Sequence, residues 1–411
     1  MQLKNLWIPA SVRGFASDAD IFDVFIENNT IVSVIPSYIA TDSVVNAVPE
    51  GMLLPCLVDL HVHIDKTFVV QDTGAADGDL FKAIGIMAEH RANWTAGDIH
   101  SRMERALDQA YANGTRAMRT HLDWAEADKP RALAVFEQLR GAWRGRITLQ
   151  CVSLTPLDLF DDAFCGEDIA LEVARVNQSG QRALGEAALL GAFVYRNARI
   201  YDKLQRVFDL ADKNNLNLDF HVDEGLDADA RGLKAIAELT IKNNYQGRVT
   251  CGHACSLAMQ APADARATLA LCAQAGIHLV ALPSTNLYLQ GAWGSTPIER
   301  GITRLIEADA LGVSISLATD NVADSFFPYG SYDLLDTFGL GVQVAHLSPA
   351  DAWLPSISSR PAAAMGLPWD GKIRLGCPAD VLLLAARNRF ELLSPAGRAR
   401  RVVRGGIFLN T

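Results

Sequence analysis

The sequence predicts an α/β fold, a (β/α)8 TIM barrel with a small β-sandwich domain formed by the N- and C-terminal segments. Two observations predict it. Eight short apolar runs alternate with longer stretches of helical periodicity through the middle of the chain, and both ends are rich in short strands. Eight strand–helix units over roughly 290 residues are the usual size of such a barrel. The length of 411 residues and a hydrophobic fraction of 49% allow the large core that it needs.

The two ends of the chain have the patterns of short strands. Residues Asp20–Val34 alternate apolar and polar around Glu27–Thr30, which is typical of two strands joined by a tight turn. Near the other end, Ile373–Leu384 and Arg401–Phe408 are short apolar stretches punctuated by Gly or Pro. Two strand-rich ends can share one unit. We therefore expect a small β-sandwich domain from residues 1–52 and 365–411 and a barrel domain from residues 53–364.

The eight apolar runs are the expected strands of the barrel. In chain order they are Leu54–His61, Arg116–His121, Ile147–Val152, Gly191–Tyr195, Leu216–Val222, Val249–His253, Ile277–Leu282 and Val313–Thr319. Stretches between them carry apolar residues three and four apart, so we expect helices that cover the outside of the sheet. They are Arg131–Trp143, Ile200–Lys213, Ala230–Asn243 and Ala265–Ala275.

The net charge and the lack of a targeting pattern restrict the kinds of partner that we expect. The chain has 37 Lys and Arg against 47 Asp and Glu, a net charge of -10, and no long basic run, so we expect it to bind neither nucleic acid nor an anionic membrane. The start lacks the apolar segment of a signal peptide, and no uncharged apolar run of about 18 residues occurs. We expect a cytoplasmic protein with reduced cysteines that acts on a small molecule.

Two histidines, His61 and His63, stand at the end of the first apolar run. In a strand, residues i and i+2 face the same side, so both imidazoles can point into one cavity at the carboxyl end of the strand, where barrel active sites lie. An imidazole pair suits a borderline divalent cation. Two packed histidines at a strand end are an equally ordinary explanation of so short a pattern.

Three further apolar runs end in titratable groups. The fifth run leads through His221 to Glu224, the sixth ends at His253, and the eighth is followed by Asp320. Taken singly, His253 could be a core histidine and Asp320 a helix N-cap. Because the carboxyl ends of barrel strands converge, four such run ends predict one shared site.

Six segments carry a family resemblance that extends from the first strand to the eighth. They are Pro55–Asp65, Arg119–Asp123, His221–Glu224, Gly252–His253, Leu282–Gly291 and Asp320–Asp324. This set resembles the amidohydrolase superfamily, and within it the cytosine deaminase group and the N-isopropylammelide-type aminohydrolases. The strand-rich ends resemble the β-sandwich that flanks the barrel in that superfamily.

The resemblance implies one divalent metal ion per chain, Fe²⁺ or Zn²⁺. The ligands that it implies are His61, His63, His221 and Asp320. The fourth run, Gly191–Tyr195, offers no lysine to bridge two ions, which favours a single ion. Because members of the family are commonly multimeric, the resemblance also implies a homo-oligomer.

The reaction that follows from such a site is hydrolytic deamination. A divalent cation lowers the pKa of bound water from about 15.7 towards roughly 7, and the resulting hydroxide can attack an electron-poor ring carbon that bears an amine. We expect Glu224 to take the proton of this water and pass it to a ring nitrogen. We expect Asp320 to take the second proton for the leaving ammonia and His253 to orient the hydroxide.

Departures from the cytosine deaminase pattern concern the substrate. Those enzymes carry a glutamine just after the third strand, where this chain has Ser153–Leu157. Asn321 and Phe326 stand near the positions of a second aspartate and a ring-packing tryptophan, and Lys66 resembles the triazine-ring aminohydrolases. The aromatic residues could stack on a planar ring or simply pack. The residues expected to bind substrate are Lys66, Phe68, His121, Leu157, Gln290, Asn321 and Phe326.

Four functions stay open from the sequence. The first is deamination of a cytosine-type pyrimidine, namely cytosine, 5-methylcytosine or isocytosine. The second is an aminotriazine aminohydrolase of the N-isopropylammelide type. The third is a ring-opening cyclic amidase of the dihydroorotase or hydantoinase type, which usually needs two metal ions bridged by a carboxylated lysine. The fourth is a non-catalytic scaffold, which predicts lost ligands.

Overall fold

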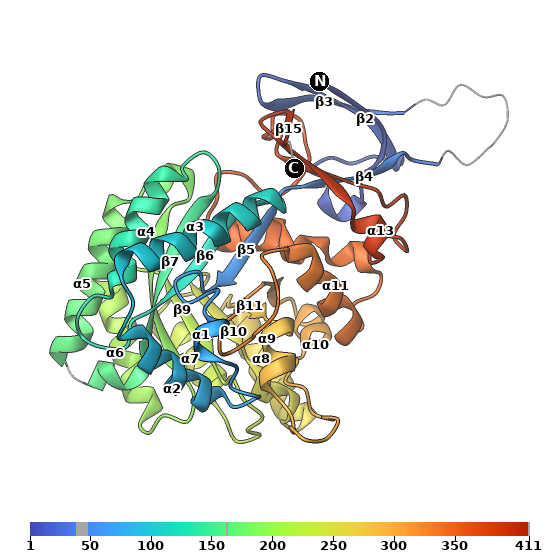
Figure 1. Ribbon diagram of the computed structural model, residues 1–411. Helices are drawn as coiled ribbons and strands as arrows, with labels where there is room; N and C mark the ends of the chain where they lie inside the picture. The colour runs from blue at the N-terminus through green and yellow to red at the C-terminus, as the bar shows by residue number, and fades with distance from the viewer. Residues whose placement is uncertain (38–47, 162, 410–411) are drawn as a thin grey trace.

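The computed structural model describes residues 1–37, 48–161 and 163–409, and these residues form two β-sheets (Figure 1). The larger sheet has eight strands that are parallel and adjacent in chain order. They are β5 (Leu57–Val62), β6 (Thr115–Asp123), β7 (Thr148–Pro156), β8 (Ala187–Val194), β9 (Leu218–Val222), β10 (Val249–His253), β11 (His278–Ala281) and β12 (Ser314–Leu317). Each overlaps one of the eight apolar runs, and the predicted barrel is confirmed.

The barrel closes where its first and last strands meet. Val62 forms a parallel bridge with Asp320, and the backbone N–H of Asp320 donates to the carbonyl oxygen of His61 at 2.9 Å. A buried carboxylate strengthens the seam, because the backbone N–H of Thr319 donates to Asp59 at 3.1 Å. Closure therefore brings two of the expected metal ligands, from opposite ends of the sheet, to one point.

Helices surround the barrel strands. The four expected helices are α4 (Arg131–Ala142), α6 (Ile200–Lys213), α7 (Gly232–Lys242) and α8 (Pro262–Gln274). The others are α1 (Val70–Thr73), α2 (Leu80–Arg91), α3 (Ala96–Ala112), α5 (Ala163–Ser179), α9 (Pro283–Leu289), α10 (Leu305–Ala310), α11 (Leu334–Val344), α12 (Ser359–Ala364) and α13 (Pro395–Arg398). In α6 the apolar residues Leu204, Val207, Phe208 and Ala211 are all buried, which is the spacing of a helix packed on a sheet. Among the described residues, no helix has the length and apolar character needed to span a bilayer.

The smaller sheet joins both ends of the chain (Figure 1). Its strand order is β15-β14-β13-β4-β1-β2-β3. The bounds are β1 (Gln2–Trp7), β2 (Ile21–Glu27), β3 (Thr30–Pro36), β4 (Gly51–Pro55), β13 (Val381–Leu384), β14 (Arg400–Arg404) and β15 (Ile407–Phe408). The predicted N-terminal hairpin is the pair β2–β3, and the two chain ends share one β-rich unit as expected.

The two sheets meet at Cys56, which separates β4 from β5. β4 pairs with β1 and β13 of the small sheet, whereas β5 pairs with β6 of the barrel. The first apolar run therefore belongs to both sheets. We propose Cys56 as the first domain boundary, slightly later than the expected position after residue 52, and residue 364, the end of α12, as the second.

An insertion between β5 and β6 carries α1 and α2 to the end of the barrel toward which β5 points (Figure 1). The sequence pattern did not predict it. Leu80, Ala83 and Met87 of α2 are buried, whereas Phe81 and Ile84 of the same helix are apolar and exposed. A helix with apolar residues all round lacks the one-sided stripe that identifies helices in a sequence.

A buried ion pair inside the barrel gives a prediction about stability. Arg119 of β6 donates to the carboxylate of Asp219 at 2.7 Å and to Gln150 at 2.9 Å, and both ions are almost fully buried. Arg119→Met leaves the Asp219 carboxylate without its main partner in the core. We expect the free energy of unfolding to fall by about 3–5 kcal/mol, measured by urea titration at one fixed metal concentration.

The matched control is Arg175→Met. Arg175 pairs with Glu137 at 2.7 Å, but its side chain is 48% exposed. Exposed pairs contribute about 0–1 kcal/mol, so this variant should unfold close to the wild type. Equal losses in the two variants would show that Arg119 does not stabilise the barrel through its buried charge.

Candidate metal centre and active site

Four side chains meet at the carboxyl ends of β5, β9 and β12. The Nε2 atoms of His61 and His221 are 3.1 Å apart, and those of His221 and His63 are 3.2 Å apart. Oδ1 of Asp320 lies 3.2 Å from Nε2 of His63 and 3.7 Å from Nε2 of His61. All four side chains are buried. The structure thus brings together every residue that the family resemblance implies as a metal ligand.

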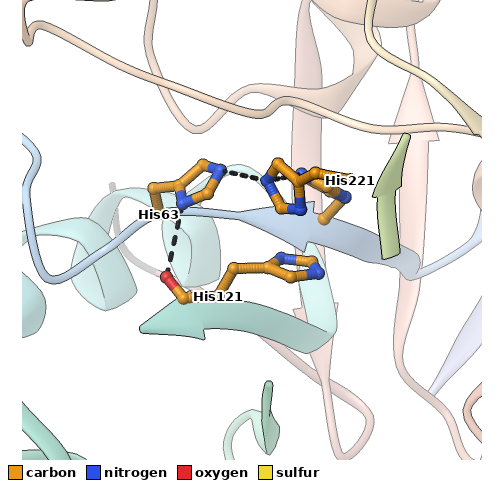
Figure 2. A group of neighbouring side chains, drawn as sticks. His63, His121 and His221 are labelled. Atoms are coloured by element: carbon orange, nitrogen blue, oxygen red, sulfur yellow. Dashed lines mark hydrogen bonds between the residues drawn. The ribbon is translucent and has the colours of Figure 1, made fainter. Parts of the chain in front are cut away.

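These distances fit the ligands of a single metal ion. Tetrahedral ligands at about 2.0–2.1 Å from zinc lie about 3.3 Å from one another. Nδ1 of His63 faces the carbonyl oxygen of His121 at 3.3 Å, and Figure 2 shows this contact together with the one between His63 and His221. A proton on Nδ1 leaves the Nε2 lone pair of His63 directed at the cluster. Buried acceptor atoms at these distances repel one another unless a cation lies between them.

Electrostatics keep the three histidines neutral. Burial lowers the pKa of His61, His63 and His221 well below the ordinary value. Repulsion from neighbouring groups lowers it further, chiefly from His121 at His61 and His221 and from Lys66 at His63. The neutral imidazole is the form that binds a metal ion, so the cluster is prepared for a cation over the physiological pH range.

Glu224 and His253 lie beside this cluster at the ends of β9 and β10. Oε1 of Glu224 is 3.3 Å from Nδ1 of His253, and the amide of Asn286 lies 3.1 Å from the same nitrogen. Burial raises the pKa of Glu224 well above the ordinary value, and the negative charge of Asp320 raises it further. Nε2 of His253 has no hydrogen-bond partner within the described residues. The pair therefore offers a proton-holding acid next to an imidazole whose second nitrogen is available to a ligand.

The backbone is strained where two of these residues leave their strands. His253 has φ 68° and Asp320 has φ 67°, in the left-handed region that residues other than glycine seldom occupy. Such conformations cost about 1–3 kcal/mol and persist only where the surrounding structure enforces them. The turn after each strand directs its side chain to the common point.

A cavity of about 680 Å³, including its open mouth, adjoins the cluster. Its polar lining consists of His63, Lys66, Arg91, Asp123, His221, Glu224, His253 and Asn321. Its apolar lining consists of Leu80, Ile84, Met87, Trp124, Ala125, Leu154, Pro156, Phe193 and Phe326. Helix α2 supplies much of the apolar wall. Sequence reasoning missed Trp124, although it directly follows the Arg119–Asp123 motif, and it missed α2 entirely.

Three of the residues expected to bind substrate line this cavity. Nζ of Lys66 lies 4.5 Å from the ring centroid of Phe326 and 2.9 Å from Oδ1 of Asp123. Asn321 donates from its amide to the carboxylate of Asp324 at 2.7 Å. Lys66 and Phe326 therefore form one polar and aromatic edge of the cavity.

The other four expected residues lie outside the cavity lining. Phe68 packs against Tyr332, with ring centroids 6.0 Å apart, Leu157 is in the hydrophobic core, and Gln290 is buried. The ring centroid of His121 is 3.9 Å from that of His61, and its Nε2 is 3.3 Å from Asp219. His121 thus lies against the histidine cluster, and one of its ring nitrogens is within 4.8 Å of ligand atoms of His61, His63 and His221.

Fold and site together assign the chain to a class. Imidazoles and a carboxylate that converge from several strand ends of a (β/α)8 barrel form a ligand set for a divalent cation at the face where barrel active sites lie. The family model of the amidohydrolase family matches residues 155–408. The chain belongs to the amidohydrolase family, and it is a hydrolase of carbon–nitrogen bonds other than peptide bonds. This removes the non-catalytic scaffold from the alternatives.

Three individual proteins are similar to this chain over nearly its whole length. The pterin deaminase of Rhizobium rhizogenes is 37% identical over 98% of this chain and 92% of its own length. The solved 5-methylcytosine deaminase of Klebsiella pneumoniae has the same fold, with a TM-score of 0.83, 23% identity, and coverage of 100% of this chain and 98% of its own. The N-isopropylammelide isopropylaminohydrolase of Burkholderia multivorans follows with a TM-score of 0.74, 25% identity, and coverage of 99% and 98%.

Proposed function

We propose that this protein is a metal-dependent deaminase of an amino-substituted nitrogen heterocycle, and that its substrate is a two-ring heterocycle of the pterin type. One observation carries the proposal. The four clustered ligand atoms, with Glu224 and His253 beside them, adjoin a cavity whose lining combines polar and apolar side chains. The pterin deaminase relative, 37% identical over nearly the whole chain, supports the choice of substrate.

The proposed metal site holds one divalent ion. His61, His63, His221 and Asp320 would bind it, and a bound divalent cation lowers the pKa of water and so supplies a nucleophile at neutral pH. The ligand set suits Fe²⁺ or Zn²⁺. Strand β8 (Ala187–Val194) contains no lysine that could bridge a second ion, which supports one ion per chain.

The proposed proton transfers use this chain's own side chains. Deamination exchanges an amine for oxygen, so one water molecule is consumed and one ammonia is released. Glu224, kept in its acid form by burial, gives a proton to a ring nitrogen and makes the amine-bearing carbon electrophilic, then regains a proton from the attacking water. Nε2 of His253 holds the attacking oxygen. Asp320 takes the second proton and passes it to the leaving amine.

The lining of the cavity supports a second ring on the substrate. The amine-bearing ring would lie beside Glu224 and Lys66. The same cavity is lined by the apolar side chains of Ile84, Met87 and Phe193, which a fused aromatic ring can cover. A single pyrimidine ring would cover less of this apolar lining.

Two other classes of substrate are each supported by one observation. A cytosine-type pyrimidine is the second candidate, because a single amine-bearing ring is enough to contact Glu224 and Lys66 in the cavity lining. An aminotriazine is the third, because Lys66 follows Asp65 as it does in the triazine-ring aminohydrolases that the sequence resembles. A cyclic amidase of the dihydroorotase or hydantoinase type ranks below both, since that class usually needs a second, bridged ion.

The test is release of ammonia by the metal-loaded protein from pterin, isocytosine, cytosine and 5-methylcytosine, and of isopropylamine from N-isopropylammelide, with a hydantoin as a ring-opening substrate. We expect kcat/KM for pterin to exceed that for each single-ring compound by about tenfold or more, since apolar contacts of ring size discriminate at this level. A higher kcat/KM for a single-ring amine would overturn the pterin assignment. Ring opening without ammonia would overturn the deaminase itself.

A further inference from the structure

The cavity wall contains a row of three charged side chains that the proton transfers above do not use. Asp123 lies at its centre, with Oδ1 2.9 Å from Nζ of Lys66 and Oδ2 2.9 Å from the guanidinium of Arg91. The side chains of Lys66, Asp123 and Arg91 are 4%, 11% and 26% exposed, so the row runs from the buried end of the cavity toward its mouth. All three line the same cavity as Glu224.

The row is held rigidly from three sides. The backbone N–H of Asp123 donates to Oδ2 of Asp65 at 3.0 Å, which fixes the end of β6 against the end of β5. Phe326 lies under the ammonium of Lys66 at 4.5 Å. Arg91 comes from α2, so its bond to Asp123 ties the helical wall of the cavity to the barrel. A rigid pair of polar groups is what recognition of one ring edge requires.

Charge states follow from the surroundings. Burial alone would lower the pKa of Lys66, but Asp123 and Asp65 beside it raise the pKa above its ordinary value. Burial alone would raise the pKa of Asp123, but Lys66 and Arg91 hold it below the ordinary value. At neutral pH the row therefore presents an ammonium donor directly beside a carboxylate acceptor.

Hydrogen-bonding capacity remains on both groups. An ammonium has three donors, and the structure shows one of them, toward Asp123. A carboxylate has about four acceptor positions, and the side chains of Lys66 and Arg91 use two at Asp123. A donor and an acceptor side by side match a ring edge with an acceptor and a donor side by side, which is a carbonyl oxygen next to a ring N–H.

We propose that Asp123 is a specificity-determining residue, that it and Lys66 recognise a lactam edge of the heterocycle, and that Arg91 is a positioning residue for Asp123. This rests on the proposed deaminase function and deepens it. The substrate class becomes a ring in which the amine-bearing carbon is followed by an N–H and a carbonyl. A 2,4-diamino ring presents an amine to the ammonium of Lys66 and a bare ring nitrogen to the carboxylate of Asp123. Both contacts are mismatched.

The experiment compares 2-amino-4-oxopteridine with 2,4-diaminopteridine, which differ only at this edge. We expect the wild type to prefer the 4-oxo compound by about 10²-fold or more in kcat/KM, because sites built around buried polar groups reject analogues that leave those groups unpaired. Asp123→Asn should lower kcat/KM for the 4-oxo compound and reduce the preference to about tenfold or less. It should also weaken binding of the deaminated 2,4-dioxo product, measured by calorimetry, at unchanged metal content.

A second variant keeps the test decisive if Asp123→Asn does not fold. Arg91→Gln leaves Lys66 and Asp123 in place, so it should raise KM for the 4-oxo compound by several fold with little change in kcat. The control is Arg196→Gln, which removes an exposed pair with Asp227 outside the cavity and should change neither constant.

The outcomes separate this inference from the function on which it rests. An unchanged 4-oxo preference in Asp123→Asn, or equal use of the two pteridines by the wild type, overturns the recognition of the lactam edge and leaves the deaminase intact. A purely structural row predicts equal losses on both substrates. If neither compound nor any single-ring amine releases ammonia with the wild type, the proposed function is overturned as well.

Discussion

Glu224→Gln is expected to lower kcat by about 10²–10⁴-fold and to leave the metal content of the protein unchanged. The carboxyl group of Glu224 is buried 3.3 Å from His253, and burial keeps its pKa far above the ordinary value. An amide has the same size but cannot give its proton to a ring nitrogen or accept one from water. Steady-state ammonia release and metal analysis by mass spectrometry measure the two quantities.

The control for this variant is Glu126→Gln. Glu126 is exposed in the segment after β6 and does not line the cavity, so we expect wild-type turnover. Retained turnover in Glu224→Gln would contradict its role as the proton carrier. Loss of the metal together with turnover would reassign Glu224 as a group that holds the ion.

His221→Ala has the second largest expected effect, because it removes the imidazole that contacts both other histidines. We expect metal affinity to fall by more than the roughly 10–100-fold that loss of an outer-shell partner costs, and activity to fall with it. Added metal should stabilise the wild type against unfolding by about 2.7 kcal/mol at a concentration of about 100 times Kd. At the same metal concentration, the variant should gain much less.

The matched control is His100→Gln on α3. His100 is partly exposed and lies 3.8 Å from Glu104, far from the clustered histidines in the chain, so its variant should bind metal and unfold as the wild type does. Full metal-dependent stabilisation of His221→Ala would contradict the assignment of the ligands.

Much of the barrel could be predicted from the sequence, because strands of a parallel sheet that are covered on both sides are continuous apolar runs. The run that begins at Leu54 shows the limit of that signal. It is one apolar stretch, but the chain passes from the small sheet to the barrel at Cys56, and apolarity alone does not record a change of sheet. Strand β8 begins before its predicted start at Gly191, because the apolar residues Ala187–Leu190 already belong to it.

The residues at the strand ends could also be predicted, since His61, His221 and Asp320 each stand at or next to the end of an apolar run and barrel topology brings such ends together. The wall of the cavity could not be predicted from the sequence. Leu80–Arg91 forms a helix whose buried residues are joined by further, exposed apolar residues, so its pattern lacks a one-sided apolar stripe. One sequence signal was available nearby, because Thr95 and Asp98 form the capping box that starts α3.

The residues expected to bind substrate fall into two groups, according to whether barrel closure or the course of a loop fixes their position. Lys66 and Asn321 follow the segments that carry the proposed metal ligands, so closure of the barrel fixes them at the cavity. Leu157 and Gln290 depend on the course of loops after β7 and α9, which local sequence does not determine, and both side chains turn into the protein interior.

The central claim is that one metal-dependent site replaces the amine of a two-ring heterocycle with oxygen from water. Its most direct test is turnover of pterin by protein loaded with a single Fe²⁺ or Zn²⁺ in water enriched in heavy oxygen. We predict one ammonia per turnover, an intact ring system, and heavy oxygen at the carbon that carried the amine, with no product from the metal-free protein. An opened ring, or full turnover after removal of the metal, would contradict the account.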